Sequence, residues 1–256
     1  MSEVMMDRIS WVTYEARVKR DAPVVFLPVG ALEQHGPHLP LGVDAMLSTA
    51  VAAEAARRVD GLVAPPLNYG YKSQARCGGG QTFPGTTSLD AASLIGLVQD
   101  VIRELARHGV RRIVVVDGHF ENQWFVTEAI ELAVRELRHD APDLRVLRTE
   151  YWDFCGKAVL DPLYPDGFPG HALEHGALME TSLMLHVHPE LVALDQLPDD
   201  GPAAFECYDV YPQRADGVPP SGVLSSAKGA EADKGALIFD AVCSGLADAV
   251  LREFQR

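Results

Sequence analysis

Short runs of consecutive apolar residues alternate along the chain with longer segments in which apolar residues recur at helical spacing. The apolar runs cover residues 22–30, 61–67 and 111–119 and are rich in valine, isoleucine and leucine, and residues 144–152 predict a further strand of mixed composition. Runs of this kind are typical of strands that are buried on both faces of a sheet. The run at 61–67 contains adjacent prolines, which should stop that strand early.

Helical spacing is clearest over residues 88–108, where large apolar side chains fall on one face: Leu94, Leu97, Val98, Val101, Ile102 and Leu105. A serine or aspartate precedes this segment as a cap, and Gly109 follows it. Further helices are expected over residues 44–59, 122–139 and about 231–254. Strands that alternate with helices predict an α/β fold, a three-layer α/β/α arrangement with a mostly parallel sheet.

Two long segments, residues 156–176 and 195–226, are rich in glycine, proline and aspartate and show no period. Loops of this length inside a compact domain are often functional. A chain of 256 residues can bury one sizeable core without disulfides or structural metals. The pattern therefore predicts a single domain over residues 1–256.

Charge and composition exclude several classes of partner. The net charge is -14 and lysines and arginines do not cluster, which argues against nucleic acid and against anionic membranes. No apolar run approaches the roughly 20 residues of a membrane helix, and the amino terminus does not resemble a secretory signal. The four cysteines never form a C-x-x-C pair, so neither a disulfide framework nor a thiolate zinc site is indicated. We expect a cytoplasmic protein with reduced thiols.

Candidate ligands for a metal follow two of the expected strands. Glu33 and His35 come after the run at 22–30, and His119 and Glu121 come at the end of the run at 111–119. In an extended segment, residues two positions apart point to the same side. The carboxyl ends of parallel strands border one crevice, so both pairs should meet there. Asp44, at the start of the next helix, is close enough in sequence to join them.

These five residues offer only oxygen and nitrogen ligands, a set that suits zinc or manganese. Five ligands are too many for one tetrahedral ion that keeps an open position. If one carboxylate bridges, they fit two ions roughly 3.5–4 Å apart, as in two-metal hydrolysis. Each residue alone is also explained as a satisfied polar group or a helix cap, so spacing by itself leaves both interpretations open.

Six stretches of the chain together resemble the creatininase family, the creatinine amidohydrolases. They are "LPVGALEQHGPHLPLGVD", "GYKSQARCGGGQTFPGTTSLD", "RELARHGVRRIVVVDGHFEN", "YWDF", "LEHGALMETSLML" and "LSSAK", spread from about residue 8 to 254. "GHFEN" and "YWDF" are more similar to creatininases themselves than to branches with Gly-Gly after the histidine. The resemblance implies a creatininase-like α/β fold, a binuclear metal centre and a homohexamer built as a trimer of dimers.

The resemblance also implies roles for individual residues. Glu33, Asp44 and His119 would hold one ion, and His35, Asp44 and Glu121 the other, with Asp44 bridging and His38 left out. Two zinc or manganese ions would lower the pKa of a bridging water, and the resulting hydroxide would attack the ring carbonyl of a cyclic amide. The implied reaction is creatinine to creatine, with Glu121, His175 and its partner Glu180 as catalytic residues. His175 would protonate the amide nitrogen.

The substrate pocket is expected at Cys77, Gly78, Phe120, Trp152, His171 and Glu174. Trp152 matches an aromatic residue that flanks the substrate in the family. Cys77 stands where creatininases have a serine, and His171 and Ala172 stand where they have Trp-Asp. These departures leave open a different small-molecule substrate, such as another cyclic guanidine, a lactam or a formamide.

Two other functional classes use some of the same residue types. A binuclear phosphoesterase uses similar ligands but would need more basic side chains than Lys72 and Arg76 to hold phosphate. A metal-buffering or purely structural oligomer subunit would not need His175 and Glu180. Both are less consistent with the sequence than an amidohydrolase.

Overall fold

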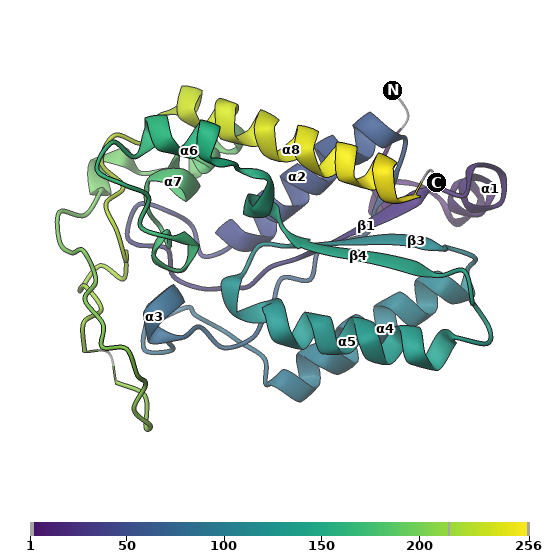
Figure 1. The fold of residues 1–256 in the computed structure, drawn as a ribbon, viewed down its shortest axis with the longest axis horizontal. Helices are drawn as coiled ribbons and strands as arrows, with labels where there is room; N and C mark the ends of the chain where they lie inside the picture. Colours follow the sequence, from purple (N-terminus) through teal and green to yellow (C-terminus); the bar gives the residue numbers. More distant parts are fainter. Residues whose placement is uncertain (1–2, 215, 255–256) are drawn as a thin grey trace.

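A parallel sheet of four strands lies at the centre of the protein (Figure 1), whose computed structural model describes residues 3–214 and 216–254. The strands are β1 (Val24–Val29), β2 (Leu62–Val63), β3 (Arg112–Asp117) and β4 (Arg145–Glu150), in the order β2-β1-β3-β4. Val29 of β1 pairs with Asp117 of β3, and Asp117 pairs with Glu150 of β4. The carboxyl ends of these three strands are therefore level, which confirms the expected parallel sheet.

Helices cover both faces of the sheet, as Figure 1 shows. One face carries α2 (Val43–Val59), α6 (Lys157–Leu163), α7 (Leu178–Val187) and α8 (Ala232–Phe254), and the other carries α4 (Ala91–Arg107) and α5 (Gln123–Leu137). The remaining helices are α1 (Trp11–Asp21) and the short α3 (Ala75–Gly78). Single 3-10 turns are η1 (Met6–Arg8), η2 (Phe120–Asn122), η3 (Tyr151–Phe154), η4 (His171–Leu173), η5 (Pro189–Leu191) and η6 (Leu194–Gln196). The three-layer α/β/α prediction is confirmed.

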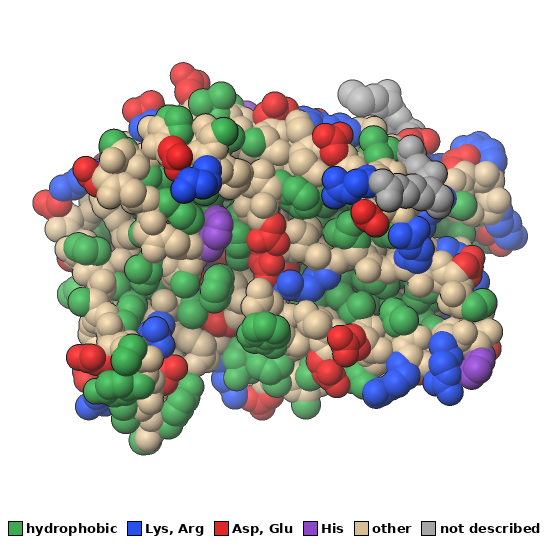
Figure 2. Space-filling model, in the orientation of Figure 1, with side chains coloured by type: hydrophobic (Ala, Val, Ile, Leu, Met, Phe, Trp, Pro, Cys, Tyr) green, Lys and Arg blue, Asp and Glu red, His purple; other side chains and the backbone are tan. Residues whose placement is uncertain are grey.

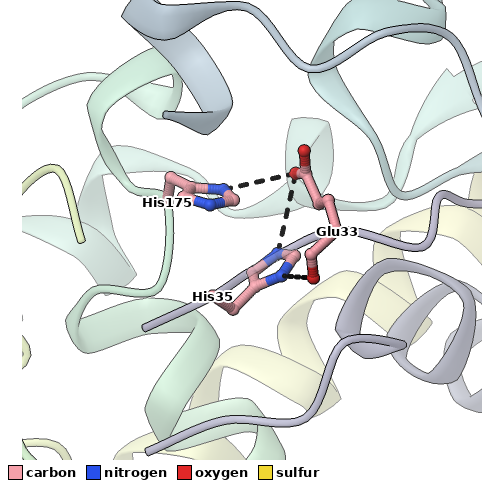
Figure 3. A group of neighbouring side chains, drawn as sticks. All are labelled: Glu33, His35 and His175. Carbon is pink, nitrogen blue, oxygen red and sulfur yellow. Dashed lines mark hydrogen bonds and ion pairs between the residues drawn. The ribbon is translucent and has the colours of Figure 1, made fainter. Parts of the chain in front are cut away.

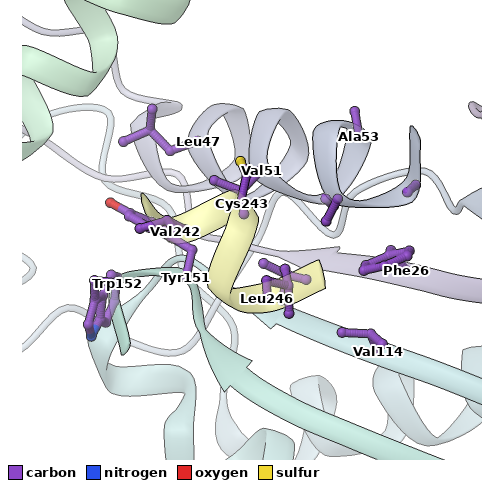
Figure 4. Packing of buried hydrophobic residues seen from close by; sticks show 14 of the residues in the cluster. Phe26, Leu47, Val51, Ala53, Val114, Tyr151, Trp152, Val242, Cys243 and Leu246 are labelled. Carbon is purple, nitrogen blue, oxygen red and sulfur yellow. The ribbon is translucent and has the colours of Figure 1, made fainter. Parts of the chain in front are cut away.

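Successive residues of the central strands supply two separate cores. Phe26 and Val114 face α2 and α8, where they pack with side chains such as Val51 and Leu246 (Figure 4). Val25, Leu27, Ile113 and Val115 belong to the second cluster, on the side of α4 and α5. Side chains alternate between the faces of a strand, so a strand covered on both faces must be apolar throughout. This explains the unbroken apolar runs in the sequence.

The elements differ from expectation where the periodic signal is weak. β2 is only Leu62–Val63, because the prolines that follow cannot continue a ladder. The sequence did not predict α1 or α7. Residues 178–184 of α7 are all buried, so that helix has no polar stripe to reveal its period. The segment at 156–176 holds α6 and η4, while residues 197–226 form no helix or strand within their described part.

The described residues near 200–214 and 216–220 belong to a long irregular segment that projects from the body of the protein (Figure 1). On the face shown in Figure 2, basic and acidic side chains are interspersed and no large block of lysine and arginine gathers. None of the described helices is long and apolar enough to cross a membrane.

Candidate metal centre

Asp44 lies at the carboxyl ends of β1 and β3, because the start of α2 comes very close to both strands. Gly30 follows β1 and Gly118 follows β3. A Cβ atom on Gly30 would lie 2.4 Å from the backbone nitrogen of Ala45, and one on Gly118 would lie 2.3 Å from the carbonyl oxygen of Asp44. Any side chain at these positions would push α2 away. The two glycines thus allow the helix to deliver its acidic residue to the edge of the sheet.

Buried carboxylates and imidazoles meet at this point. Three overlapping groups each place their potential ligand atoms within 4.8 Å of one another: Glu33, His35 and His175; Glu33, Asp44 and His119; and His35, Asp44 and Glu180. Figure 3 shows the first group, in which one carboxylate oxygen of Glu33 faces both imidazoles. Asp44 Oδ1 lies 2.9 Å from His35 Nε2, and Asp44 Oδ2 lies 3.1 Å from His119 Nδ1. Asp44 therefore faces both imidazoles, as a bridging ligand would.

The cluster fits a pair of divalent cations. Glu33 Oε2, Asp44 Oδ2 and His35 Nε2 are buried and make no well-directed hydrogen bond among the described residues, although the last two lie within ion-pair distance of His119 and Asp44. Buried polar atoms are nearly always paired, and an unpaired carboxylate oxygen is especially costly. Oxygen and imidazole nitrogen are ligands that zinc and manganese accept. The unpaired atoms lie on the same residues that the geometry groups together, so bound cations would satisfy them.

The charges of the cluster shift the pKa values of its members. Burial disfavours a charged His35, but the neighbouring carboxylates, Asp44 first, outweigh burial and raise its pKa to about 10. At His119 the carboxylates of Glu33 and Glu121 likewise outweigh burial and raise the pKa well above its usual value. Burial raises the pKa of both Glu121 and Glu180 to about 7. The cluster thus holds more carboxylate than its surroundings can neutralise, which is the condition that favours a bound cation.

Glu121 and Glu180 are grouped differently from the expectation. Glu121 Oε2 lies 3.5 Å from His119 Nε2, and Glu121 is not in the group built around His35. The third member of that group is Glu180, whose Oε2 lies 3.8 Å from His35 Nε2. His119 and Glu121 do not lie on one extended segment, because residues Phe120–Asn122 form the turn η2.

His175 contacts the cluster through one ring nitrogen and the backbone through the other. Its Nε2 lies 2.6 Å from the carbonyl oxygen of Gln34, so this nitrogen carries the hydrogen and donates it. Its Nδ1 is then unprotonated and lies 3.4 Å from Glu33 Oε1. Burial lowers the pKa of His175 to about 3 and keeps the ring neutral. Glu180, the expected partner of His175, instead accepts a hydrogen bond of 2.6 Å from the backbone nitrogen of Gly176.

Gln34 is a site residue that sequence reasoning did not single out. Its Nε2 donates to the carbonyl oxygens of Gly78, at 3.0 Å, and Gly222, at 2.9 Å. Its Oε1 accepts a bond of 2.9 Å from the backbone nitrogen of Gly36. The side chain therefore ties together loops that flank His175. The sequence signal that could have identified Gln34 is its position in "LEQHG", between the candidate ligands Glu33 and His35.

The expected pocket residues Cys77, Phe120, Trp152, His171 and Glu174 line the same cavity as the clustered carboxylates and imidazoles. Gly78 is adjacent, since a Cβ atom there would lie 2.7 Å from Glu33 Oε2. The cavity has a volume of about 20 Å³, room for roughly one water molecule. A larger cavity of about 800 Å³ lies elsewhere, and none of the clustered carboxylates and imidazoles lines it.

Part of the cavity lining outside the cluster is aromatic and polar. His171 lies over Trp152, with ring centroids 6.0 Å apart and planes inclined by 26°, and it packs against Phe168 at 4.8 Å. His171 Nδ1 and Glu174 Oε2 are buried and unpaired among the described residues. The other oxygen of Glu174 accepts hydrogen bonds from the Tyr164 hydroxyl and from a backbone nitrogen. Two polar atoms on this wall are therefore available to a ligand.

Comparison with known proteins gives a consistent result. The creatininase family model, described as creatinine amidohydrolase, matches residues 7–250. A creatinine amidohydrolase of Pseudomonas putida is 52% identical over 253 residues, which cover 98% of this chain and 97% of that protein. A mycofactocin precursor peptide peptidase of Mycobacterium ulcerans is 34% identical over 230 residues, 85% of this chain and 80% of that protein.

Solved structures of creatininase align over 100% of both chains at 51% identity. They include a glutamate-to-glutamine variant complexed with creatine and creatininase with manganese, each with a TM-score of 0.96. The same variant in a Zn-Zn form has a TM-score of 0.97.

Proposed function

The chain belongs to the creatininase family, and we propose that it is a metal-dependent amidohydrolase that opens the ring of creatinine to give creatine. In this reaction the amide carbon–nitrogen bond breaks, the oxygen of water goes to the carbonyl carbon, and a proton goes to the departing ring nitrogen. Support comes from the nearly full-length likeness to a creatinine amidohydrolase and to a creatininase complexed with creatine.

The observation that carries the proposal is the position of Asp44, whose two oxygens face two imidazoles in a buried cluster. Glu33, Asp44 and His119 would hold one ion, with Glu121 adjoining them. His35, Asp44 and Glu180 would hold the other. Two zinc or manganese ions at such a site supply Lewis acidity and lower the pKa of a coordinated water.

The protein's own groups then manage the protons. The carbonyl oxygen of Gln34 fixes the hydrogen of His175 on Nε2, so Nδ1 is the atom that accepts and returns a proton. Glu33 beside Nδ1 would stabilise the charged ring while it holds that proton. A departing amide nitrogen needs a proton before it becomes a good leaving group, and His175 is within reach of the cavity to supply it.

The cavity wall favours a small flat molecule with N–H groups. Trp152 offers an aromatic face, and Glu174 Oε2 is an unpaired acceptor for the N–H of a guanidine-like group. The cavity is too small for such a ring, so we expect the segment that carries His171 to move when substrate enters.

The unpaired His171 Nδ1, where creatininases have tryptophan, favours a second candidate substrate. That candidate is a different cyclic guanidine, a lactam or a formamide.

A comparison of substrates tests the proposal directly. The purified protein, loaded with zinc or manganese, should hydrolyse creatinine with a higher kcat/KM than a panel of lactams, cyclic guanidines and formamides. Higher turnover of another panel member would establish the second candidate instead. A fully metallated protein that hydrolyses no amide but does hydrolyse p-nitrophenyl phosphate would overturn both. No lysine or arginine is among the described residues that line the cavity, so we do not expect that result.

We also propose that the chain acts as one domain, in the cytoplasm, within a homohexamer. The family match over residues 7–250 and the single sheet support one domain. Large apolar side chains that are exposed on the isolated chain, such as Trp11 and Trp124, support burial against further copies. Light scattering of the purified protein should give a mass about six times that of the 27.8 kDa chain.

A further inference from the structure

Asn122 is completely buried where three segments of the chain meet, and its side chain bonds to all of them. Its Nδ2 donates to the carbonyl oxygen of Gly30 at 3.2 Å and to Asp117 Oδ1 at 3.1 Å. Its Oδ1 accepts a bond of 2.8 Å from the backbone nitrogen of Tyr71. One amide thus joins the ends of β1 and β3 to the loop that follows β2. None of these bonds is made to a candidate metal ligand.

The backbone of Tyr71 connects Asn122 to His119. The carbonyl oxygen of Tyr71 accepts a bond of 3.0 Å from His119 Nε2, so this nitrogen carries the hydrogen. In the neutral ring that a metal ligand requires, Nδ1 is then the nitrogen without a hydrogen, and it lies 3.3 Å from Glu33 Oε1 and 3.1 Å from Asp44 Oδ2. Asp117 holds the same histidine from the other side, since its Oδ1 also accepts the backbone N–H of His119 at 3.1 Å.

We propose that Asn122 is a positioning residue of the metal centre, acting through the backbone of Tyr71. By holding the N–H of Tyr71, Asn122 helps to place the carbonyl of the same residue, which orients the His119 ring with Nδ1 toward Glu33 and Asp44. Histidine ligands usually donate their second N–H to a protein group, and loss of such outer partners typically weakens metal binding about 10–100-fold. The inference rests on the proposed function only in requiring that the cluster binds an ion.

A different role would be purely structural, with Asn122 stabilising the fold by satisfying buried backbone groups. The two roles predict different results, because a structural residue changes the free energy of unfolding and leaves the affinity of the folded site unchanged. Val126 offers a matched control. It is also fully buried and lies on α5, the next helix along the chain, but no hydrogen bond links its side chain to Tyr71. Val126→Ala should destabilise the fold and retain the affinity for zinc.

The experiment measures the dissociation constant for Zn²⁺ by titrating metal-free full-length protein in competition with a chromogenic chelator. Asn122→Ala should weaken zinc binding about 10–100-fold relative to the wild type, while Val126→Ala should bind as the wild type does. Gly70→Ala provides a second variant that keeps the asparagine, because its Cβ would lie 2.6 Å from the carbonyl oxygen of Gly30 and 2.7 Å from Asn122 Oδ1 and would disturb the bond between Asn122 and Tyr71. It should weaken zinc binding in the same way.

Equal zinc affinity in the wild type and in the folded Asn122→Ala variant would overturn the inference. If Asn122→Ala does not fold, equal affinity in Gly70→Ala would overturn it. A wild-type protein that binds no Zn²⁺ would instead overturn the proposed function. Because the readout is metal affinity and not turnover, an error in the assigned substrate leaves this test intact.

Discussion

Replacing Gln34 by methionine should weaken both the fold and the active site. Methionine has a similar length but cannot hydrogen-bond in the same way, so the Gln34→Met variant leaves the carbonyls of Gly78 and Gly222 and the N–H of Gly36 without their partner. The two carbonyls belong to buried residues. At about 1–3 kcal/mol for each buried unsatisfied group, the free energy of unfolding should fall by about 3 kcal/mol. This is a large share of the roughly 5–15 kcal/mol of a typical domain.

Urea denaturation followed by circular dichroism measures this change, and steady-state kinetics measures its effect on the site. We expect kcat to fall by about 10-fold or more, because the loops beside His175 would no longer be held in register. Gln99→Met is the matched control. Gln99 makes its side-chain bond to Glu136 at the exposed surface, and its loss should change stability by less than about 0.5 kcal/mol. A Gln34→Met variant as stable and active as Gln99→Met would refute this account of Gln34.

Three further outcomes follow from the site. Asp44→Asn should lose bound metal, measured by mass spectrometry of metal content. Its activity should fall by more than the roughly 10–100-fold that is typical when a residue that hydrogen-bonds to a ligand is replaced. Two retained ions with full rate would contradict the bridging role. Burial lowers the pKa of His38 from 6.5 to about 4. The unfolded chain therefore takes up a proton first, and stability should fall as the pH drops from 6.5 towards 4, by at most about 3 kcal/mol. Chelator-treated His38→Gln should lack this part of the acid destabilisation in urea titrations, and an unchanged pH profile would exclude it. His171→Trp should raise kcat/KM for creatinine roughly 10-fold relative to other amides if creatinine is the native substrate of the pocket; a decrease would favour the second substrate class.

The sequence was informative where signals are local. Strands buried on both faces are continuous apolar runs, and the residues that follow them are level at one edge of a parallel sheet. Glu33, His35 and His119 could therefore be grouped before the fold was known. Asp44 belonged with them because it begins the helix after the first strand. A helix such as α7 has no amphipathic pattern when nearly all its positions are buried, so its period was not detected.

Contacts between distant segments could not be predicted in the same way. Gln34 and His175 are 141 positions apart, and their contact depends on how the loop after β1 meets the segment before α7. The role of Glu180 as the partner of His175 was implied by the family resemblance and not by spacing. The start of α7 instead turns Glu180 toward the backbone of Gly176 and toward His35. The direction of a side chain at a helix start follows from backbone geometry, which spacing alone does not define.

The cluster is organised by backbone groups more than by contacts among its own side chains. His119 is oriented by the carbonyl of Tyr71, and His175 by the carbonyl of Gln34. In each ring Nε2 donates to that carbonyl, which leaves Nδ1 facing the cluster. Carboxylates packed this closely repel one another, so a site held only by its charges would rearrange without a cation. Because rigid peptide groups hold both rings from outside, the ligand geometry is set before metal binds, and less of the binding free energy is spent on ordering side chains.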